Sequence, residues 1–209
     1  MYHQDGEVKC LVMKLINSFI GKGFIEPKIC DSLIQLYESF PVKSPGTVGE
    51  DNDSVVNRSL KDNTEVFIPI TESSLFPYIT ALTTVLDTYK QKYVYATKQQ
   101  ASWLIDKNIK IQKYLPGQGY HLWHFEKTGN QSCINRHLVF ATFLNNIKDS
   151  GACGGTEFYY QKLKIKPQKG LTIIFPAEWT HTHRGIVTTK DTKYLITGWF
   201  SYNMEKLNV

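Results

Sequence analysis

Histidines gather in the second half of the chain, where five of the six lie between residues 121 and 183. His124 and Glu126 are separated by one residue in a strand-like run, so both side chains are expected on one face. Side chains placed in this way can converge on one metal ion. A third ligand must come from another segment, and His183 or His181 can supply it, since both follow the apolar run Leu171–Phe175.

Two imidazoles and one carboxylate are the ligand set of non-haem Fe(II) oxygenases, whose open coordination positions accept a second molecule and O2. A His-x-Glu pattern alone also fits a surface pair of two polar side chains. A zinc hydrolase built on His121, His124 and His181 is a further alternative, although the chain lacks the H-E-x-x-H motif known for such sites. The interpretation of the histidines therefore depends on the residues around them.

Lys193 lies ten residues after His183 and begins an apolar run. A lysine ammonium in a strand covered on both faces is costly unless it meets an anion. Lys193 could instead lie at the mouth of the strand and extend its ammonium to water, and the segment alone leaves both interpretations open. The two alternating sets of side chains, both largely apolar, are Lys193, Leu195, Thr197 and Trp199 on one face and Tyr194, Ile196 and Phe200 on the other.

The elements that must position these residues are expected in one domain, 1–209, with a helix-rich part, 1–100, and a strand-rich core, 101–204. A helix is predicted over 27–40, because Pro27 suits a first turn and one apolar stripe continues to Pro41. A second apolar stripe predicts a helix over 72–93. Residues 42–63 are polar and rich in Gly, Asp and Asn, which predicts a long loop. Residues 8–19 fit a helix, but 13–20 fit an opening strand equally well.

After Tyr93 the apolar pattern changes to a period of two, and turn signals become frequent. Seven or eight short strands at close spacing indicate a sandwich or a jelly roll. Lysines at 162, 164 and 166 alternate with apolar residues, which is typical of an edge strand with one wet face. The predicted strands cover 103–105, 109–114, 120–125, 138–144, 158–165, 171–175, 185–187 and 194–201.

The composition of the 209 residues, 42% hydrophobic and 21% charged, excludes a disordered chain and a coiled coil. A net charge of +5 is too small and dispersed for a nucleic-acid surface. No apolar run is long enough to span a membrane, and no secretory signal is recognisable, so we expect a cytoplasmic protein. No pattern predicts an oligomeric state. The cysteines, which we expect to be free thiols, are Cys10, Cys30, Cys133 and Cys153.

Several segments taken together resemble the 2-oxoglutarate/Fe(II)-dependent dioxygenases, and most nearly their prolyl 4-hydroxylase-like branch. The likeness rests on Tyr114–Glu126, Gly154–Phe158, Pro167–Pro176, His183–Val187 and Lys193–Phe200, which follow the order and spacing of the family. It extends over about residues 109–202, whereas the first hundred residues match only in general helical character.

The resemblance implies that His124, Glu126 and His183 bind Fe(II) and form the catalytic centre. His181 in place of His183 would break the family spacing to Lys193, so this spacing favours His183. Most members have Asp where this chain has Glu126, and the longer side chain must fold back by one methylene. A jelly-roll protein that binds a metal or ligand without turnover is therefore the alternative from a different functional class.

The resemblance also implies a site for 2-oxoglutarate. Lys193 would bind the distal carboxylate of this cosubstrate, and Tyr114 and Thr197 would add hydroxyl contacts. Phe143 stands where related hydroxylases can place a Tyr that helps to bind 2-oxoglutarate. We therefore expect Lys193 to hold the carboxylate with less help.

The expected fold is mainly β within an α+β chain: a double-stranded β-helix, or cupin-like jelly roll, with N-terminal supporting helices. The implied reaction uses Fe(II), 2-oxoglutarate and O2, with ascorbate as a candidate reductant, releases succinate and CO2, and hydroxylates an unactivated C–H bond. The expected substrate is a prolyl or other residue of a peptide or protein, and the alternative is a small metabolite or a nucleobase. Segments 42–63 and 127–136 are predicted to flank the mouth of the pocket.

Overall fold

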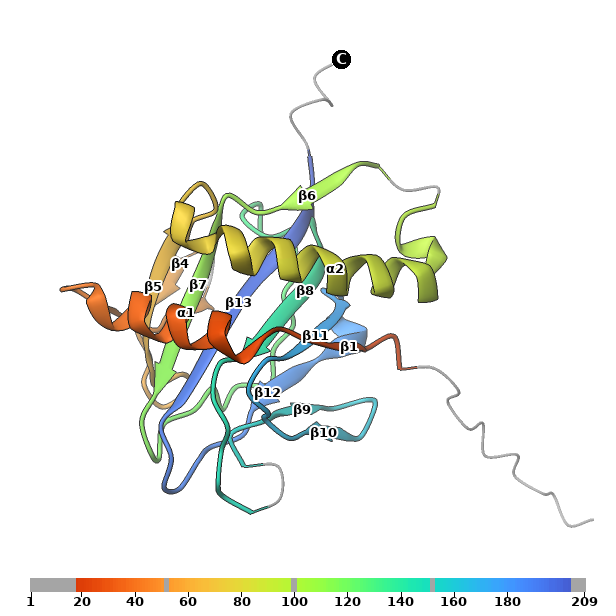
Figure 1. The fold of residues 1–209 in the computed structure, drawn as a ribbon. Coiled ribbons are helices and arrows are strands. Elements are labelled where there is room, and N and C mark those ends of the chain that lie inside the picture. The colour runs from red at the N-terminus through yellow and green to blue at the C-terminus, as the bar shows by residue number, and fades with distance from the viewer. Residues whose placement is uncertain (1–17, 51–52, 99–100, 151–152, 204–209) are drawn as a thin grey trace, which may run out of the picture.

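The computed structural model describes residues 18–50, 53–98, 101–150 and 153–203 (Figure 1). Within these residues, an eight-stranded antiparallel sheet has the order β1-β11-β8-β13-β7-β5-β2, and β6 pairs with β13. The strands are β1 (Gly21–Phe24), β2 (Ser44–Pro45), β5 (Thr64–Pro69), β6 (Trp103–Ile105), β7 (Asn108–Tyr114), β8 (Arg136–Phe143), β11 (Leu171–Pro176) and β13 (Lys193–Tyr202).

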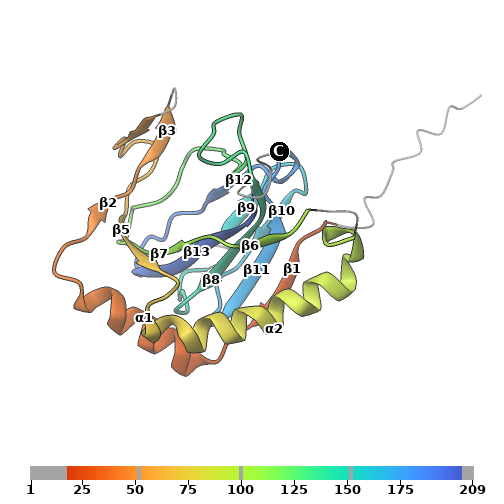
Figure 2. The same ribbon diagram turned by 90° about the horizontal axis from the view of Figure 1, so that it is seen from above.

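A smaller antiparallel sheet lies on the side of the large sheet away from the helices (Figure 2). Its order in the described residues is β10-β9-β12, from β9 (Thr156–Phe158), β10 (Leu163–Ile165) and β12 (His183–Gly185). A hairpin of β3 (Val48–Glu50) and β4 (Asp53–Val55) stands apart from both sheets. The fold is the expected double-stranded β-helix of the jelly-roll type.

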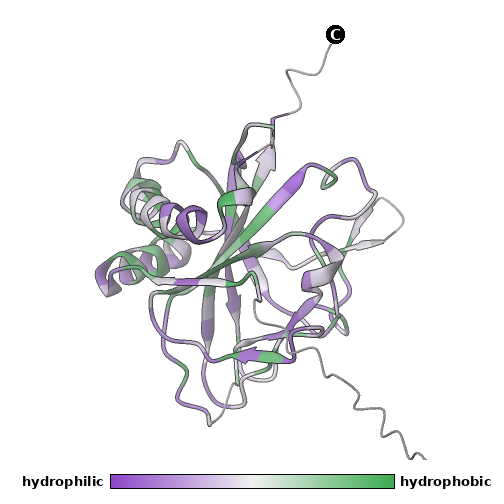
Figure 3. Cartoon of the chain, turned by 90° about the vertical axis from the view of Figure 1, so that its right-hand side faces the viewer, coloured by the Kyte–Doolittle hydropathy of each residue, from purple (hydrophilic) through white to green (hydrophobic). Residues whose placement is uncertain are grey.

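Two α-helices cover the outer face of the large sheet, α1 (Pro27–Ser39) and α2 (Phe76–Lys92) (Figure 1 and Figure 2). Both carry hydrophobic and hydrophilic residues at helical spacing, and they bury the apolar stripe (Figure 3). Both predicted helices are confirmed, although a short 3-10 turn, η1 (Ser73–Leu75), precedes α2. The buried residues of α2 are Tyr78, Leu82, Val85, Leu86 and Tyr89, as the stripe predicts.

The hydrophobic core has two parts, and β13 contributes to both. Ile196 and Phe200 are buried between the large sheet and the helices. Leu195 and Trp199, on the other face of the strand, pack against the cluster between the two sheets. The prediction of a strand covered on both faces is therefore confirmed.

The predicted strand 120–125 is wrong, because this segment changes its backbone partner several times. The amides of His121 and Leu122 donate to Leu60, the amide of His124 donates to His183, and the amide of Glu126 donates to Ala177. No continuous ladder forms, and only two isolated bridges remain among the described residues, Lys61↔Tyr120 and His124↔His183. The chain in this region is placed by three distant segments rather than by one neighbouring strand.

The predicted strand 158–165 is two strands, β9 and β10, joined by a turn over residues 159–162. Lys162 adopts a positive φ of 50° in this turn, a conformation that its residue type does not predict. β10 is one of the two edge strands of the small sheet, and Lys164 is exposed on it. The prediction of an edge strand is confirmed for this part.

Three features of the N-terminal half differ from the expectations. β5 was not predicted, although Val66 and Ile68 alternate with other residues and are buried. The expected loop 42–63 contains β2, β3 and β4. Residues 8–17 of the ambiguous first segment lie outside the described residues, and β1 begins after it at Gly21.

Cys30, Cys133 and Cys153 are free thiols as expected, whereas Cys10 lies outside the described residues. None of the helices in the described part of the chain is long and apolar enough to cross a membrane.

Candidate active site

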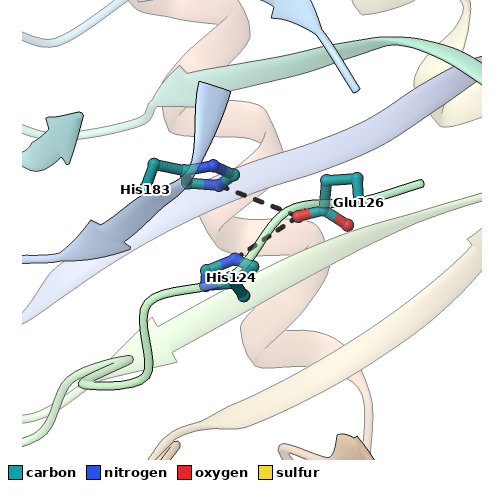
Figure 4. A group of neighbouring side chains, drawn as sticks. All are labelled: His124, Glu126 and His183. Atoms are coloured by element: carbon teal, nitrogen blue, oxygen red, sulfur yellow. Dashed lines mark ion pairs between the residues drawn. The ribbon is translucent and has the colours of Figure 1, made fainter. Parts of the chain in front are cut away.

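His124, Glu126 and His183 meet at the inner face of the jelly roll, with their ligating atoms within 4.8 Å of one another (Figure 4). The Nε2 atoms of His124 and His183 lie 3.4 Å and 3.8 Å from Glu126 Oε1. The two histidines are held together by their backbones, since each amide donates to the carbonyl of the other at 3.0 Å and 2.8 Å. The structure thus brings the three predicted residues to one point.

Backbone carbonyls fix the ring orientation of both histidines by hydrogen bonds with the ring nitrogens that face away from Glu126. Nδ1 of His124 contacts the Leu122 carbonyl at 2.9 Å, and Nδ1 of His183 contacts the His181 carbonyl at 2.9 Å. A carbonyl oxygen only accepts, so Nδ1 carries the proton and Nε2 keeps its lone pair for a metal. Burial, together with the nearby His124, lowers the pKa of His183 to about 3, so its ring is neutral as a ligand must be.

The Glu126 carboxylate is anchored through one of its two oxygens. Trp199 Nε1 donates to Oε2 at 2.9 Å, and Arg136 donates to the same oxygen at 3.3 Å. Burial alone would raise the pKa of Glu126, but the interactions with His124, His183 and the Arg136 guanidinium outweigh it and hold this pKa well below its usual range. The group is therefore an anion that presents Oε1 to the histidines.

The other histidines point elsewhere. His181 is buried, with Nε2 at 3.0 Å from the Ser18 carbonyl and Nδ1 at 3.0 Å from Thr180 Oγ1, so both ring nitrogens are engaged. His137 contacts the Ala96 carbonyl at 2.9 Å. His121 is exposed, and neither it nor His181 belongs to the cluster of candidate metal ligands found in the described residues. The trio proposed for a zinc hydrolase therefore does not come together.

A pocket of about 610 Å³, counted with its open mouth, contains the three residues and continues along β13. Lys193, Leu195, Thr197 and Trp199, the alternating set on one face of the strand, all line it. Phe143 is buried in the cluster between the sheets and is not among the lining residues. The strand thus presents an ammonium, a hydroxyl and an indole to one cavity.

Lys193 is buried without a counter-ion. Its Nζ lies 4.1 Å from the centre of the Tyr114 ring, and no carboxylate of the described residues forms an ion pair with it. Burial lowers the pKa of Lys193 to about 8. Thr197 Oγ1 is also buried without a hydrogen-bond partner in the described part of the chain. An ammonium and a hydroxyl in this condition fit an anionic ligand with oxygen atoms.

Tyr114 is tied to a buried polar network that composition and spacing did not reveal. Its hydroxyl donates to Gln112 Oε1 at 3.3 Å, and Gln112 donates to Glu65 Oε2 at 3.2 Å. Lys61 forms an ion pair with the same oxygen at 2.9 Å, and Asn63 donates to it at 3.4 Å. The network links the segment before β5 to the wall of the pocket.

Two other residues of the site were missed from the sequence. The Tyr120 ring stacks on the His124 ring, with centroids 3.8 Å apart and planes 15° apart. The Arg136 guanidinium lies 3.7 Å from the centre of the Trp199 ring and contacts Glu126. Arg136 stands alone in sequence with no signal of this role. Trp199, on the same face of the strand as Lys193, lies in the wall of the pocket.

Residues 109–201 match the family model described as the 2OG-Fe(II) oxygenase superfamily, where 2OG is 2-oxoglutarate. This match covers the strand-rich part of the chain, where the motifs lie, and supports a 2-oxoglutarate/Fe(II) oxygenase there. The oxygenase that the motifs predict is thus supported by the family match. The family implies Fe(II), 2-oxoglutarate and O2, and the donor set of two imidazoles and one carboxylate fits the iron.

Solved structures of prolyl hydroxylases share the fold of this oxygenase. A viral collagen prolyl hydroxylase from Paramecium Bursaria Chlorella virus-1, in complex with 2OG, has a TM-score of 0.67 and 18% identity, covering 90% of this chain and 98% of that one. The Pseudomonas putida prolyl-4-hydroxylase has a TM-score of 0.64 and 12% identity, covering 88% and 92%. A Trichoplax adhaerens prolyl hydroxylase, in complex with a hypoxia inducible factor peptide fragment, has a TM-score of 0.64 and 20% identity, covering 90% and 87%. No curated protein sequence matches the chain significantly.

Proposed function

We propose that this oxygenase hydroxylates a prolyl residue of a polypeptide, with iron held by His124, Glu126 and His183. The observation that carries the proposal is the convergence of these three ligand atoms in one pocket with the Lys193 ammonium, which has no ion pair among the described residues. When bound, Fe(II) with 2-oxoglutarate supplies the oxidising chemistry that hydroxylates a C–H bond and yields succinate and CO2.

The chain contributes orientation and charge to this reaction. The Leu122 and His181 carbonyls orient the two imidazoles, and Trp199 and Arg136 orient the Glu126 carboxylate. We assign the distal carboxylate of 2-oxoglutarate to Lys193, with Thr197 as a hydroxyl partner. The Tyr114 hydroxyl becomes a second partner when it exchanges its bond to Gln112 Oε1 for this carboxylate. The ammonium then gains the counter-ion that it lacks among the described residues, which is the main support for this assignment.

The polypeptide substrate is supported by the likeness to prolyl hydroxylases, one of which was solved with a peptide fragment. Two segments predicted to flank the pocket fit this role in part. The segment 42–63 contacts the chain before His124 through the Lys61↔Tyr120 bridge, and Arg136 at the end of 127–136 contacts Glu126. A long ligand suits a pocket with two such walls better than a small one.

The test has two stages. Anaerobic addition of Fe(II) and then 2-oxoglutarate should produce the weak visible absorption band of the chelate, and His183→Ala should lose it. Succinate formation should then rise with proline-rich peptides but not with free proline. Absence of the band, or stimulation only by free proline or non-peptide metabolites, contradicts the proposal.

A further inference from the structure

Four aromatic side chains form a continuous row on the surface next to the pocket, which we call the aromatic row: Trp123, Tyr159, Tyr160 and Trp179. Neighbouring rings lie 5.2 Å, 5.2 Å and 5.6 Å apart and meet edge to face. Tyr159, Tyr160 and Trp179 are 56%, 49% and 57% exposed. A cluster of large, solvent-exposed aromatic side chains is unusual on a protein surface unless it is a binding site.

The backbone below the aromatic row is held firmly. The Tyr159 amide donates to the Thr182 carbonyl at 2.9 Å, and Gln161 Nε2 donates to the Thr180 carbonyl at 2.9 Å. These bonds tie the turn between β9 and β10 to the segment that carries Trp179. The rings are therefore positioned before any ligand arrives, which lowers the entropy cost of binding.

The aromatic row is continuous with the catalytic pocket at two points. Trp123 directly precedes His124, and Tyr159 follows Phe158, whose ring lies 5.6 Å from that of His183. Arg184 joins the two surfaces, since it lines the pocket and its guanidinium lies 4.4 Å from the centre of the Trp123 ring. A chain whose reacting residue is in the pocket can therefore continue over these rings.

The chemistry of the aromatic row favours a neutral, apolar chain with free carbonyl groups. Two of the nearby cations, Arg184 and Lys164, are paired with Glu157 at 2.9 Å and 3.4 Å, and Lys162 in the turn is exposed to solvent. The hydroxyls of Tyr159 and Tyr160 have no hydrogen-bond partner among the described residues and can donate to a ligand. Aromatic-lined surfaces bind polyproline II segments, whose backbone carbonyls make no internal hydrogen bonds.

We propose that the aromatic row binds the part of the substrate polypeptide that flanks the hydroxylated residue, in polyproline II conformation. This inference rests on the proposed function of the neighbouring site. With ring steps of 5.2–5.6 Å and a rise of ~3.1 Å per residue, the row spans at most about five residues of such a chain. The enzyme should then distinguish a long proline-rich chain from a tripeptide by affinity rather than by turnover rate.

The test compares Tyr160→Ala and Trp179→Ala with Tyr95→Ala, a control that removes a ring 68% exposed on another surface. Binding of a fluorescently labelled proline-rich 15-residue peptide is measured by anisotropy, and KM and kcat are measured for this peptide and for a tripeptide. We expect each variant of the row to raise the Kd and KM of the long peptide about five- to tenfold. The kcat, the tripeptide kinetics and the control should remain unchanged.

Unchanged Kd and KM for the long peptide in both variants would overturn the inference while leaving the oxygenase function intact. An equal rise in KM for the tripeptide would also overturn the inference, because the substitutions would then be disturbing the catalytic pocket and not a separate binding surface. If the long peptide binds more weakly to the variants of the row but no protein turns it over, the proposed function is contradicted, whereas the aromatic row is supported as a peptide-binding surface. Wild-type binding of a soluble polysaccharide in place of the peptide would assign the row to another ligand and overturn the proposal.

Discussion

Trp199 Nε1 donates to Oε2 of Glu126 at 2.9 Å, and this bond determines which carboxylate oxygen faces the histidines. Arg136 holds the same oxygen at 3.3 Å. The other oxygen, Oε1, faces the Nε2 atoms of His124 and His183, at 3.4 Å and 3.8 Å. The additional methylene of glutamate is thus accommodated by fixing one oxygen, which leaves the other as a candidate ligand.

Trp199→Phe keeps an aromatic ring but removes the hydrogen bond to Glu126. We expect a 10- to 100-fold loss of Fe(II) affinity, of the order found when partners of metal ligands are removed. The Fe(II) affinity is measured by anaerobic titration. Trp103→Phe is the matched control, because it removes an indole bond to the Ala96 carbonyl at 3.1 Å, away from the site. Equal affinity in the two variants would show that the bond has no role in metal binding.

Glu126→Asp and Glu126→Ala should differ in degree. Aspartate is too short to keep both the bonds to Oε2 and the position of Oε1, so iron affinity should fall about tenfold with turnover still detectable. Alanine removes the anionic ligand and should nearly abolish coupled hydroxylation. Metal titration and succinate release are the measurements. Wild-type values in both variants would exclude Glu126 as a ligand.

His183→Ala should abolish Fe(II) binding, whereas His181→Ala should retain it. Two remaining ligands do not hold a labile divalent ion against water. His181→Ala removes contacts to Ser18 and Thr180 instead, so its effect should appear in thermal stability. Stoichiometric iron in purified His183→Ala, with loss in His181→Ala, would reverse the assignment.

Lys193→Ala should weaken 2-oxoglutarate binding about 30-fold or more, which corresponds to ~2 kcal/mol, while Fe(II) affinity changes little. Lys110 is the matched control, since it also lines the pocket but lies 5.1 Å from the centre of the Trp199 ring. The two variants are compared by the equilibrium binding of 2-oxoglutarate to the Fe(II)-loaded proteins under anaerobic conditions. A larger loss of 2-oxoglutarate affinity in Lys110→Ala than in Lys193→Ala would show that Lys110, and not Lys193, binds the carboxylate.

The affinity for 2-oxoglutarate should decrease as the pH rises above about 8, the pKa to which burial lowers Lys193. Below this pH the ammonium is already charged and pairs with the carboxylate. Above it, binding must also take up a proton, so the affinity should fall by up to about tenfold per pH unit. Lys193→Met should lack this dependence, and a wild-type affinity that stays constant from pH 7 to 9 would contradict the assignment.

Much of this site follows from regular patterns in the sequence. The alternating set of Lys193, Leu195, Thr197 and Trp199 lines the pocket because side chains of a regular strand alternate between faces. The helices over 27–40 and 72–93 are predicted because helical spacing determines which face is buried.

Irregular backbone explains most of what the sequence did not predict. Amides within residues 121–126 donate to the carbonyls of Leu60, His183 and Ala177, which are distant in the chain and invisible to a local pattern. The turn before β10 depends on Lys162 at positive φ, where a glycine would have been the usual signal. Arg136 acts only through tertiary contacts, with Glu126 and with the Trp199 ring.

The two faces of β13 limit how this enzyme could be altered. Ile196 and Phe200 support the helices from the same strand that lines the pocket with Lys193 and Thr197, so a substitution on either face is transmitted to the other. The hairpin of β9 and β10 ends at a sheet edge, and its turn is bounded by exposed side chains. An engineer seeking a new substrate should therefore randomise the turn of that hairpin, 159–162, and leave β13 untouched.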